Sequence, residues 1–199
     1  MMKKNLLEKK EFRDIIGDII SDTKRAGEVI RNLRDLYREQ KIEFHPIDIN
    51  SILEDALRLL HSEFIMQRVK LTQDLDSSLP PVNGNRVQIQ QVLVNLFMNS
   101  FQAMSGMANE NRQIHVKSAF HKNMIDVWIE DNGTGIKLEK IDQIFEPLAT
   151  WKPGGTGMGL AISKSIIESH GGKMRAENRD QGGARVGFIL PALKEDKQK

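Results

Sequence analysis

Cysteine is absent from this chain of 199 residues. Its absence excludes disulfide bonds, thiolate metal sites and cysteine nucleophiles together. Long hydrophobic runs are missing as well, because no apolar stretch approaches the roughly 20 residues of a membrane-spanning helix. The basic N-terminal residues are not followed by the apolar core of a signal peptide. We therefore expect a cytoplasmic location and no membrane segment in this chain.

A strong excess of either charge is also lacking. The net charge is only +2, from 29 Lys and Arg residues against 27 Asp and Glu residues. So weak an overall field gives no reason to expect a nucleic-acid partner. The contents of 39% hydrophobic and 28% charged residues are ordinary for a globular protein. Any binding of a phosphate group must then come from a local site.

Proline is absent from residues 5–41, where Gly17 and Gly27 are the only glycines. Apolar and small side chains recur there at steps that alternate between four and three residues, as in a coiled coil or helical bundle. We expect a long helix that forms a dimer; a helix packed on its own domain is the alternative. The chain divides near Pro46, into residues 1–45 and 46–199. The spaced positions are Phe12, Ile16, Ile19, Thr23, Ala26, Ile30, Leu33 and Tyr37.

Helical and strand patterns alternate after this boundary. An extended entry at 46–50, a turn at 80–84 and a loop at 147–157 separate them. Their mixed order, without regular β-α-β repetition, predicts an α+β fold, a two-layer sandwich of helices on a largely antiparallel sheet. The expected helices are 51–64, 85–104, 138–145 and 159–170, and the expected strands are 69–75, 113–120, 124–130, 173–178 and 184–190.

Two asparagines, Asn95 and Asn99, occur one turn apart in the helix expected at 85–104. Residues four apart lie on one face of a helix. Asparagine is a mediocre helix former, so two in register suggest a purpose. An amide oxygen suits a magnesium ion shared with phosphate groups. Two ordinary surface asparagines are the alternative.

A carboxylate follows the strand expected at 124–130, in the sequence Asp131-Asn-Gly-Thr-Gly135. The carboxylate could accept a hydrogen bond from an exocyclic amine, while the glycines let a flat ring approach the backbone. An ordinary Asp-Asn-Gly turn is the alternative.

Closely spaced glycines, Gly155, Gly157 and Gly159, lead into the helix expected at 159–170. Backbone N–H groups at such a helix start favour an anion. The spacing matches neither a dinucleotide fingerprint nor a Walker loop. A flexible hinge is the alternative.

These motifs, with Phe145-Glu-Pro147 between the second and third, resemble in order and spacing the N, G1, F and G2 boxes of the histidine-kinase catalytic domain. That domain belongs to the GHKL superfamily of ATP-binding proteins, whose fold is the Bergerat fold. The resemblance covers residues from about 46 to 191. Residues 24–38 also resemble the second helix of the dimerisation domain of these kinases.

The resemblance implies roles for individual residues. Asn99 takes the position of the magnesium ligand, and Asn95 that of a catalytic residue in the phosphate or metal shell. Asp131 matches the carboxylate that binds the adenine amino group, beside Gly133 and Gly135. The other nucleotide-binding positions are Ile136, Lys152, Gly155, Thr156, Gly157, Met158, Gly159 and Leu160.

Residues 148–156 match the mobile ATP lid, and Phe145 matches the residue that links lid and partner helix. Gln102 replaces a basic residue of many relatives, so we expect Lys152 to act in catalysis by supplying charge near the phosphates. The family's phosphoacceptor histidine, which precedes an acidic residue, has no counterpart here.

The resemblance therefore implies an ATP- and magnesium-binding catalytic fragment of a two-component sensor histidine kinase. The implied partners are ATP, a response regulator and the dimerisation helix of the parent kinase, with a homodimer formed through the N-terminal helix. An anti-sigma-type serine kinase and a non-catalytic nucleotide-binding dimerisation module remain alternatives. Asn95 argues against ATP hydrolysis, since an amide cannot act as a general base.

Overall fold

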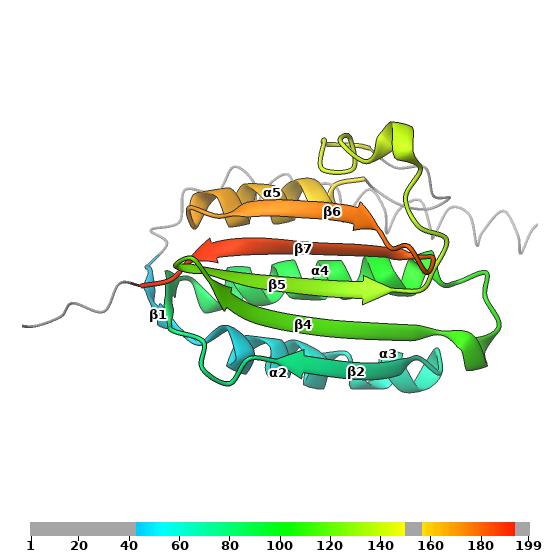
Figure 1. Cartoon of the computed structure of the whole chain (residues 1–199), viewed down its shortest axis with the longest axis horizontal. Helices are drawn as coiled ribbons and strands as arrows, with labels where there is room; N and C mark the ends of the chain where they lie inside the picture. The colour runs from blue at the N-terminus through cyan, green and yellow to red at the C-terminus, as the bar shows by residue number, and fades with distance from the viewer. Residues whose placement is uncertain (1–42, 150–156, 194–199) are drawn as a thin grey trace, which may run out of the picture.

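The computed structural model describes residues 43–149 and 157–193. A five-stranded sheet of order β2-β4-β5-β7-β6 forms one layer, and helices α2, α4 and α5 cover one of its faces (Figure 1). This arrangement confirms the predicted two-layer α+β fold. The helix expected at 5–41 lies outside the described residues. No helix of the described part is long and apolar enough to cross a membrane.

All five strands of this sheet occur where the sequence predicted them. Four neighbouring pairs hold the sheet together, and only the β2–β4 pair is parallel. The strands are β2 (Lys70–Leu75), β4 (Gln113–His121), β5 (Met124–Asp131), β6 (Lys173–Asn178) and β7 (Ala184–Pro191).

Two short strands were not predicted as strands, although the first overlaps the extended entry expected at 46–50. Strand β1 (His45–Ile47) pairs antiparallel with β3 (Val82–Gly84), in place of the turn expected at 80–84. Three residues are too few to show an alternating pattern, so only the pairing partner reveals them.

The helix expected at 51–64 is instead two helices, α2 (Ile49–Leu59) and α3 (His61–Met66). The carboxylate of Asp48 caps α2 by accepting the N–H groups of Asn50 and Ser51 at 2.9 and 3.2 Å. The chain bends at Leu60, which has φ −92° and ψ 7°. Leu60 is buried at the bend, so packing overrides the local helical pattern.

The helix expected at 138–145 is also wrong. Only a short 3-10 helix, η2 (Leu138–Lys140), forms, and turns follow it. Its hydrogen bonds join residues three apart, as from the Lys140 N–H to the Lys137 carbonyl at 2.9 Å. Ile144 alone is buried between 138 and 145, so too little apolar surface packs to sustain an α-helix. A further 3-10 helix, η1 (Asn109–Asn111), precedes β4.

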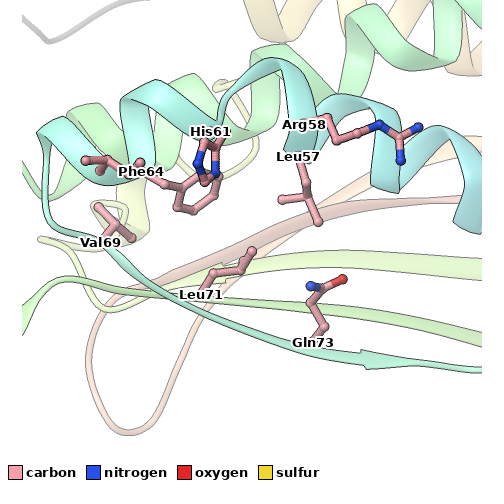
Figure 2. Close-up of a pocket in the computed structure, with 8 residues that line it drawn as sticks. Leu57, Arg58, His61, Phe64, Val69, Leu71 and Gln73 are labelled. Carbon is pink, nitrogen blue, oxygen red and sulfur yellow. The ribbon is translucent and has the colours of Figure 1, made fainter.

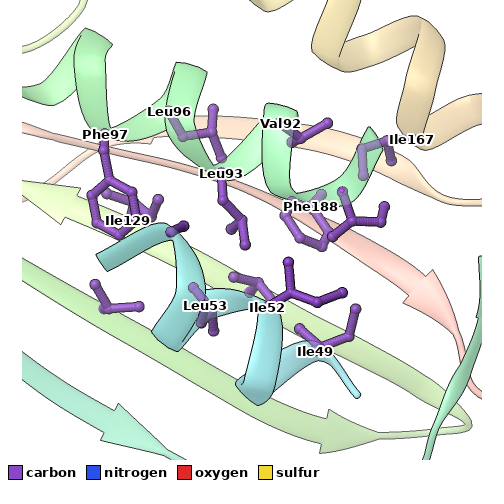
Figure 3. Close-up of a cluster of buried hydrophobic side chains, with 14 of the residues drawn as sticks. Ile49, Ile52, Leu53, Val92, Leu93, Leu96, Phe97, Ile129, Ile167 and Phe188 are labelled. Atoms are coloured by element: carbon purple, nitrogen blue, oxygen red, sulfur yellow. The ribbon is translucent and has the colours of Figure 1, made fainter. Parts of the chain in front are cut away.

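Helix α4 (Arg86–Ala103) crosses the core and confirms the prediction of 85–104. It lies between α2 and α5 (Gly159–Ser169), and Leu93 and Phe97 point from it toward α2 and the sheet (Figure 3). The Phe64 ring meets the Phe101 ring edge-on, with centroids 4.9 Å apart. This packing leaves Asn95 and Asn99 half-buried.

His170 joins the end of α5 to the start of α4. Its Nδ1 lies 2.7 Å from the Ile166 carbonyl oxygen, and the Asn85 N–H donates to its Nε2 at 3.0 Å. Phe44 stacks on the ring, with centroids 4.5 Å apart. One acceptor and one donor suit the neutral ring, with the proton on Nδ1. Burial lowers the pKa of His170, so the ring is neutral rather than a charged helix-end cation.

We expect buried His170 to make the free energy of unfolding depend on pH. An unfolded chain takes up the His170 proton near the usual pKa of 6.5, whereas the folded chain, whose pKa is lower, does not. The neutral His170 ring therefore stabilises the fold fully above about pH 6.5, and this stabilisation is lost as pH falls toward the pKa of the folded chain. The total loss is about 1.4 kcal/mol for each unit by which folding lowers the pKa. Urea unfolding between about pH 8 and pH 5 measures the slope.

The variant His170→Gln should flatten this slope, because its amide does not titrate in that range. His61→Gln is the matched control, since His61 is exposed on α3. Equal slopes in the His170 variant and the unaltered chain would contradict the prediction.

Candidate functional site

Asn95 ties α4 to the first turn of α5. Its Nδ2 donates to the Gly159 carbonyl oxygen at 3.3 Å and to the Ser163 hydroxyl at 3.4 Å. Ser163 is fully buried between the two helices and itself donates to the Gly159 carbonyl at 2.9 Å. Asn99 lies one turn further along the same side of α4. The asparagines and the glycine-led start of α5 are therefore neighbours.

Asp131 is the last residue of β5 and is 3% exposed. One of its carboxylate oxygens accepts the N–H of Gly133 at 2.9 Å. It faces the helices, because side chains alternate along β5 and the adjacent Glu130 forms ion pairs with Lys117 and Arg185 on the other face. A buried carboxylate thus stands at the end of a strand, directly beside a loop.

The loop at 131–136 packs on the C-terminal end of α4. The Thr134 N–H donates to the Ala103 carbonyl at 3.2 Å. A Cβ on Gly133 would lie 2.7 Å from that same oxygen, so only glycine fits there. Gly135 has φ +71°, a conformation that glycine adopts readily. The structure therefore brings the Asp131 loop to the helix that carries the two asparagines.

The start of α5 is the third part of the candidate site, after the two asparagines of α4 and the loop at 131–136. Gly157 has φ +66°, and a Cβ there would lie 2.6 Å from the Leu148 carbonyl carbon. Met158 precedes the helix, is 2% exposed and provides no side-chain hydrogen bond to cap it. Among the described residues, no N-cap side chain bonds the first backbone N–H groups of α5, and such N–H groups favour an anion. Leu160 follows, half-buried.

All these features lie along α4. Asn95 meets α5 in the middle of the helix, while Ala103 meets the Asp131 loop at its end. Eight residues of helix separate these points by about 12 Å. The predicted residues Lys152, Gly155 and Thr156 lie outside the described residues; Ile136 lies in the loop.

Two residues in contact with this loop were not predicted. Asn178 bonds to both backbone groups of Ile136, and Arg179 donates to the Asp131 carbonyl at 2.9 Å. Strands β5 and β6 both run antiparallel to β7, so their C-terminal residues lie at the same end of the sheet. Asn178 and Arg179 are visible in the sequence as polar residues at the end of a predicted strand, but that feature alone does not indicate a site.

A surface hollow lies elsewhere. It is a groove of about 720 Å³ between α2–α3 and the edge strand β2 (Figure 2). Its lining is mainly apolar and includes none of the predicted residues. A smaller hollow of about 450 Å³ lies beside β6 and includes Phe145. The convergence on α4, which supplies carboxylate, amide and backbone N–H groups, is the better candidate for a polar ligand.

The histidines of the described residues do not form part of this convergence. His45, His61 and His121 are exposed on β1, α3 and β4, and His170 is buried at the far end of α5. His115 lies near the start of β4, opposite Glu130 and therefore on the face of the sheet away from Asp131.

Comparison with known proteins adds independent evidence. Residues 84–194 match the family model for histidine kinase-, DNA gyrase B- and HSP90-like ATPases. The chain is similar to the sensor protein FixL of Bradyrhizobium diazoefficiens, with 40% identity over 173 residues, which are 86% of this chain and 34% of that protein. It therefore spans about a third of the length of this curated relative.

Two solved structures of the histidine kinase ThkA are also similar. The nucleotide-free catalytic domain covers 75% of this chain and 96% of that domain, with a TM-score of 0.67 and 31% identity. The complex of ThkA with the response regulator TrrA covers 88% of this chain and 49% of that chain, with a TM-score of 0.74 and 26% identity. The matched region includes β5, α4 and α5, so the chain belongs to the family of histidine kinase-, DNA gyrase B- and HSP90-like ATPases.

Proposed function

We propose that this chain is the ATP- and magnesium-binding catalytic part of a sensor histidine kinase. The supporting observation is the position of Asp131, buried at the end of β5 beside a loop that packs on the same helix as Asn95 and Asn99. The relatives that match most of this chain are sensor proteins and histidine kinases. Transfer of the γ-phosphoryl group of ATP to a histidine on another helix is the activity that follows.

Each part of the site has a role in this proposal. Asp131 accepts a hydrogen bond from the adenine amino group, beside Gly133, Gly135 and Ile136. Asn95 holds the start of α5 in place and contacts the phosphate or metal shell. The phosphates lie against the backbone N–H groups at the start of α5, from Gly157, Met158, Gly159 and Leu160, with further contacts from Lys152, Gly155 and Thr156.

The amide oxygen of Asn99 suits a magnesium ion. Magnesium prefers oxygen ligands and is usually held by one or two protein groups together with substrate phosphates. The described residues contain no group of three His, Asp or Glu that could hold a metal ion by themselves. The ion would therefore be shared between Asn99 and the triphosphate, where it neutralises phosphate charge when bound.

Phosphoryl transfer asks mainly for positioning and charge neutralisation. The Asn95 amide is bonded to Gly159 and cannot take a proton from water, so the site favours transfer over hydrolysis. The acceptor is a histidine on the first dimerisation helix of the parent kinase. A response regulator then receives the phosphoryl group, and the N-terminal helix joins two copies of the chain; the ThkA–TrrA complex supports the regulator as partner.

A labelling experiment tests this function. We expect the chain, incubated with γ-labelled ATP, magnesium and a separate acceptor-helix peptide, to label a histidine of the peptide. We expect no label on the chain alone, because none of its described histidines lies in the convergence on α4. Acid-labile label on the chain alone would contradict that second expectation. Label on a serine of a partner protein would indicate a serine kinase, and binding without any transfer would indicate a non-catalytic module.

A further inference from the structure

The loop at 131–136, which forms the adenine side of the proposed site, has no helix or strand of its own beyond Asp131. Bonds to neighbouring elements therefore set its shape. The Asn132 side chain fastens it toward β4, by donating to the Asn111 carbonyl at 2.6 Å and accepting the Gln113 N–H at 2.9 Å. Ala103 of α4 fastens its middle. A third attachment comes from the end of β6.

Asn178 makes that attachment with both ends of its amide. Its Oδ1 accepts the Ile136 N–H at 2.7 Å, and its Nδ2 donates to the Ile136 carbonyl at 2.6 Å. One side chain thus satisfies both backbone groups of a residue 42 positions away in sequence. A Cβ on Gly135 would lie 3.0 Å from the Asn178 Oδ1, so a glycine at 135 is needed for this close approach.

The turn that follows β6 contacts Asp131, the first residue of the loop. Arg179 donates from Nη1 to the Asp131 carbonyl at 2.9 Å, and its Nε lies 3.6 Å from the buried Glu130 carboxylate. The Arg179 N–H closes the turn on the Gly183 carbonyl at 3.1 Å. A Cβ on Gly183 would lie 2.1 Å from the Asp131 carbonyl oxygen, so this turn is pressed against the loop. The end of β6 and its turn therefore hold both the first and the last residue of the loop.

We propose that Asn178 is a positioning residue for the nucleotide. It holds Ile136 and Gly135 at a set distance from the Asp131 carboxylate. The carboxylate and the backbone of Gly135 then form a preformed slot for a flat ring. A slot formed in advance binds more tightly, because the loop loses little freedom when the ligand enters. This inference rests on the proposed ATP-binding function.

Loss of these two bonds should loosen the loop without unfolding the sheet. Asn178 pairs with Ala184 through backbone groups, and this pairing does not depend on its side chain. Ile136 is half-buried and lies outside the hydrophobic core. A role in positioning thus differs from a role in global stability, and the two can be measured separately.

Calorimetry with the full chain and two variants tests the proposal. We expect Asn178→Ala to weaken ATP and ADP binding by the same factor, about tenfold, because both ligands share the adenine ring. Asn178→Asp keeps the acceptor for the Ile136 N–H but places an oxygen against the Ile136 carbonyl, so it should weaken binding similarly. Hydrogen exchange of the Ile136 amide in the ligand-free chain should become faster in Asn178→Ala.

Asn50→Ala is the matched control. Asn50 also makes two side-chain bonds, to the Asp76 carbonyl and the Ser118 hydroxyl, both at 2.8 Å. Ser118 pairs with Val127, four residues along β5 from Asp131. This variant should lose stability but retain ATP affinity. An equal loss of affinity in Asn50→Ala, or unchanged affinity in Asn178→Ala, would overturn the inference alone; failure of the unaltered chain to bind ATP would overturn the proposed function and this inference with it.

Discussion

The substitution Asp131→Asn is expected to reduce ATP binding by at least about 100-fold, or about 2.7 kcal/mol. The carboxylate oxygen that accepts the Gly133 N–H must remain an oxygen, because that N–H lies only 2.9 Å away. An asparagine at this position therefore presents its NH2 group where the second carboxylate oxygen stood. A donor then faces the adenine amino group, which is itself a donor, and a buried pair of donors is costly. Isothermal titration calorimetry measures the loss directly.

Asp126→Asn provides the control for this prediction. Asp126 is on the same strand but on the opposite face, where it forms an ion pair with Arg175. Its replacement removes one carboxylate from β5 without touching the loop at 131–136. Thermal unfolding of both variants shows whether the fold persists. An unchanged affinity in folded Asp131→Asn would refute the assignment of Asp131 as the adenine acceptor.

The sheet could be predicted because apolar residues alternate with polar ones along parts of its strands, as in β4, where Ile114 and Val116 are buried and His115 and Lys117 are partly exposed. In β5, Ile125, Val127 and Ile129 are buried at 0 to 1% exposure, and Asp126 between them faces the other side. The bend at Leu60 and the 3-10 segment at 138–140 could not be predicted, because packing elsewhere in the chain decides between local structures of similar intrinsic preference. The β1–β3 pair depends on residues nearly 40 positions apart and has no local signature.

The candidate site is visible in the sequence as separate motifs but not as an arrangement. Asparagines one turn apart and glycines before a helix are visible in the sequence, since each reflects a local requirement. Their convergence on α4 depends on long-range contacts, such as that of Asn95 with Gly159, 64 residues away. Asn178 shows most clearly what the sequence alone does not reveal, because its proposed role depends on β5 and β6 ending at the same end of the sheet. No local pattern distinguishes it from an ordinary residue at the end of a strand.

The substitution Asn99→Ala is expected to remove the magnesium dependence of ATP binding and to slow phosphoryl transfer by at least about 100-fold. Asn99 is half-buried on α4, between Asn95 and the end that contacts the Asp131 loop. Alanine favours a helix more than asparagine does, so α4 should remain intact. Loss of the amide oxygen removes the proposed metal ligand, and the triphosphate should then keep its charge at the point where transfer requires neutralisation. The proposed adenine contact at Asp131 is not altered, so weak binding should persist.

That combination separates a metal ligand from a general structural role. ATP affinity with magnesium should fall to the value measured with a chelator, whereas the chelator value itself should not change. Asn99→Asp, which restores an oxygen ligand, should recover part of the magnesium dependence. Gln90→Ala removes an amide from the same helix at a half-buried position before Asn95 and should leave both values unchanged. If Asn99→Ala keeps a full magnesium response, the metal is held by other groups, and the triphosphate must lie further from α4 than the positions of Asn95 and Gly159 indicate.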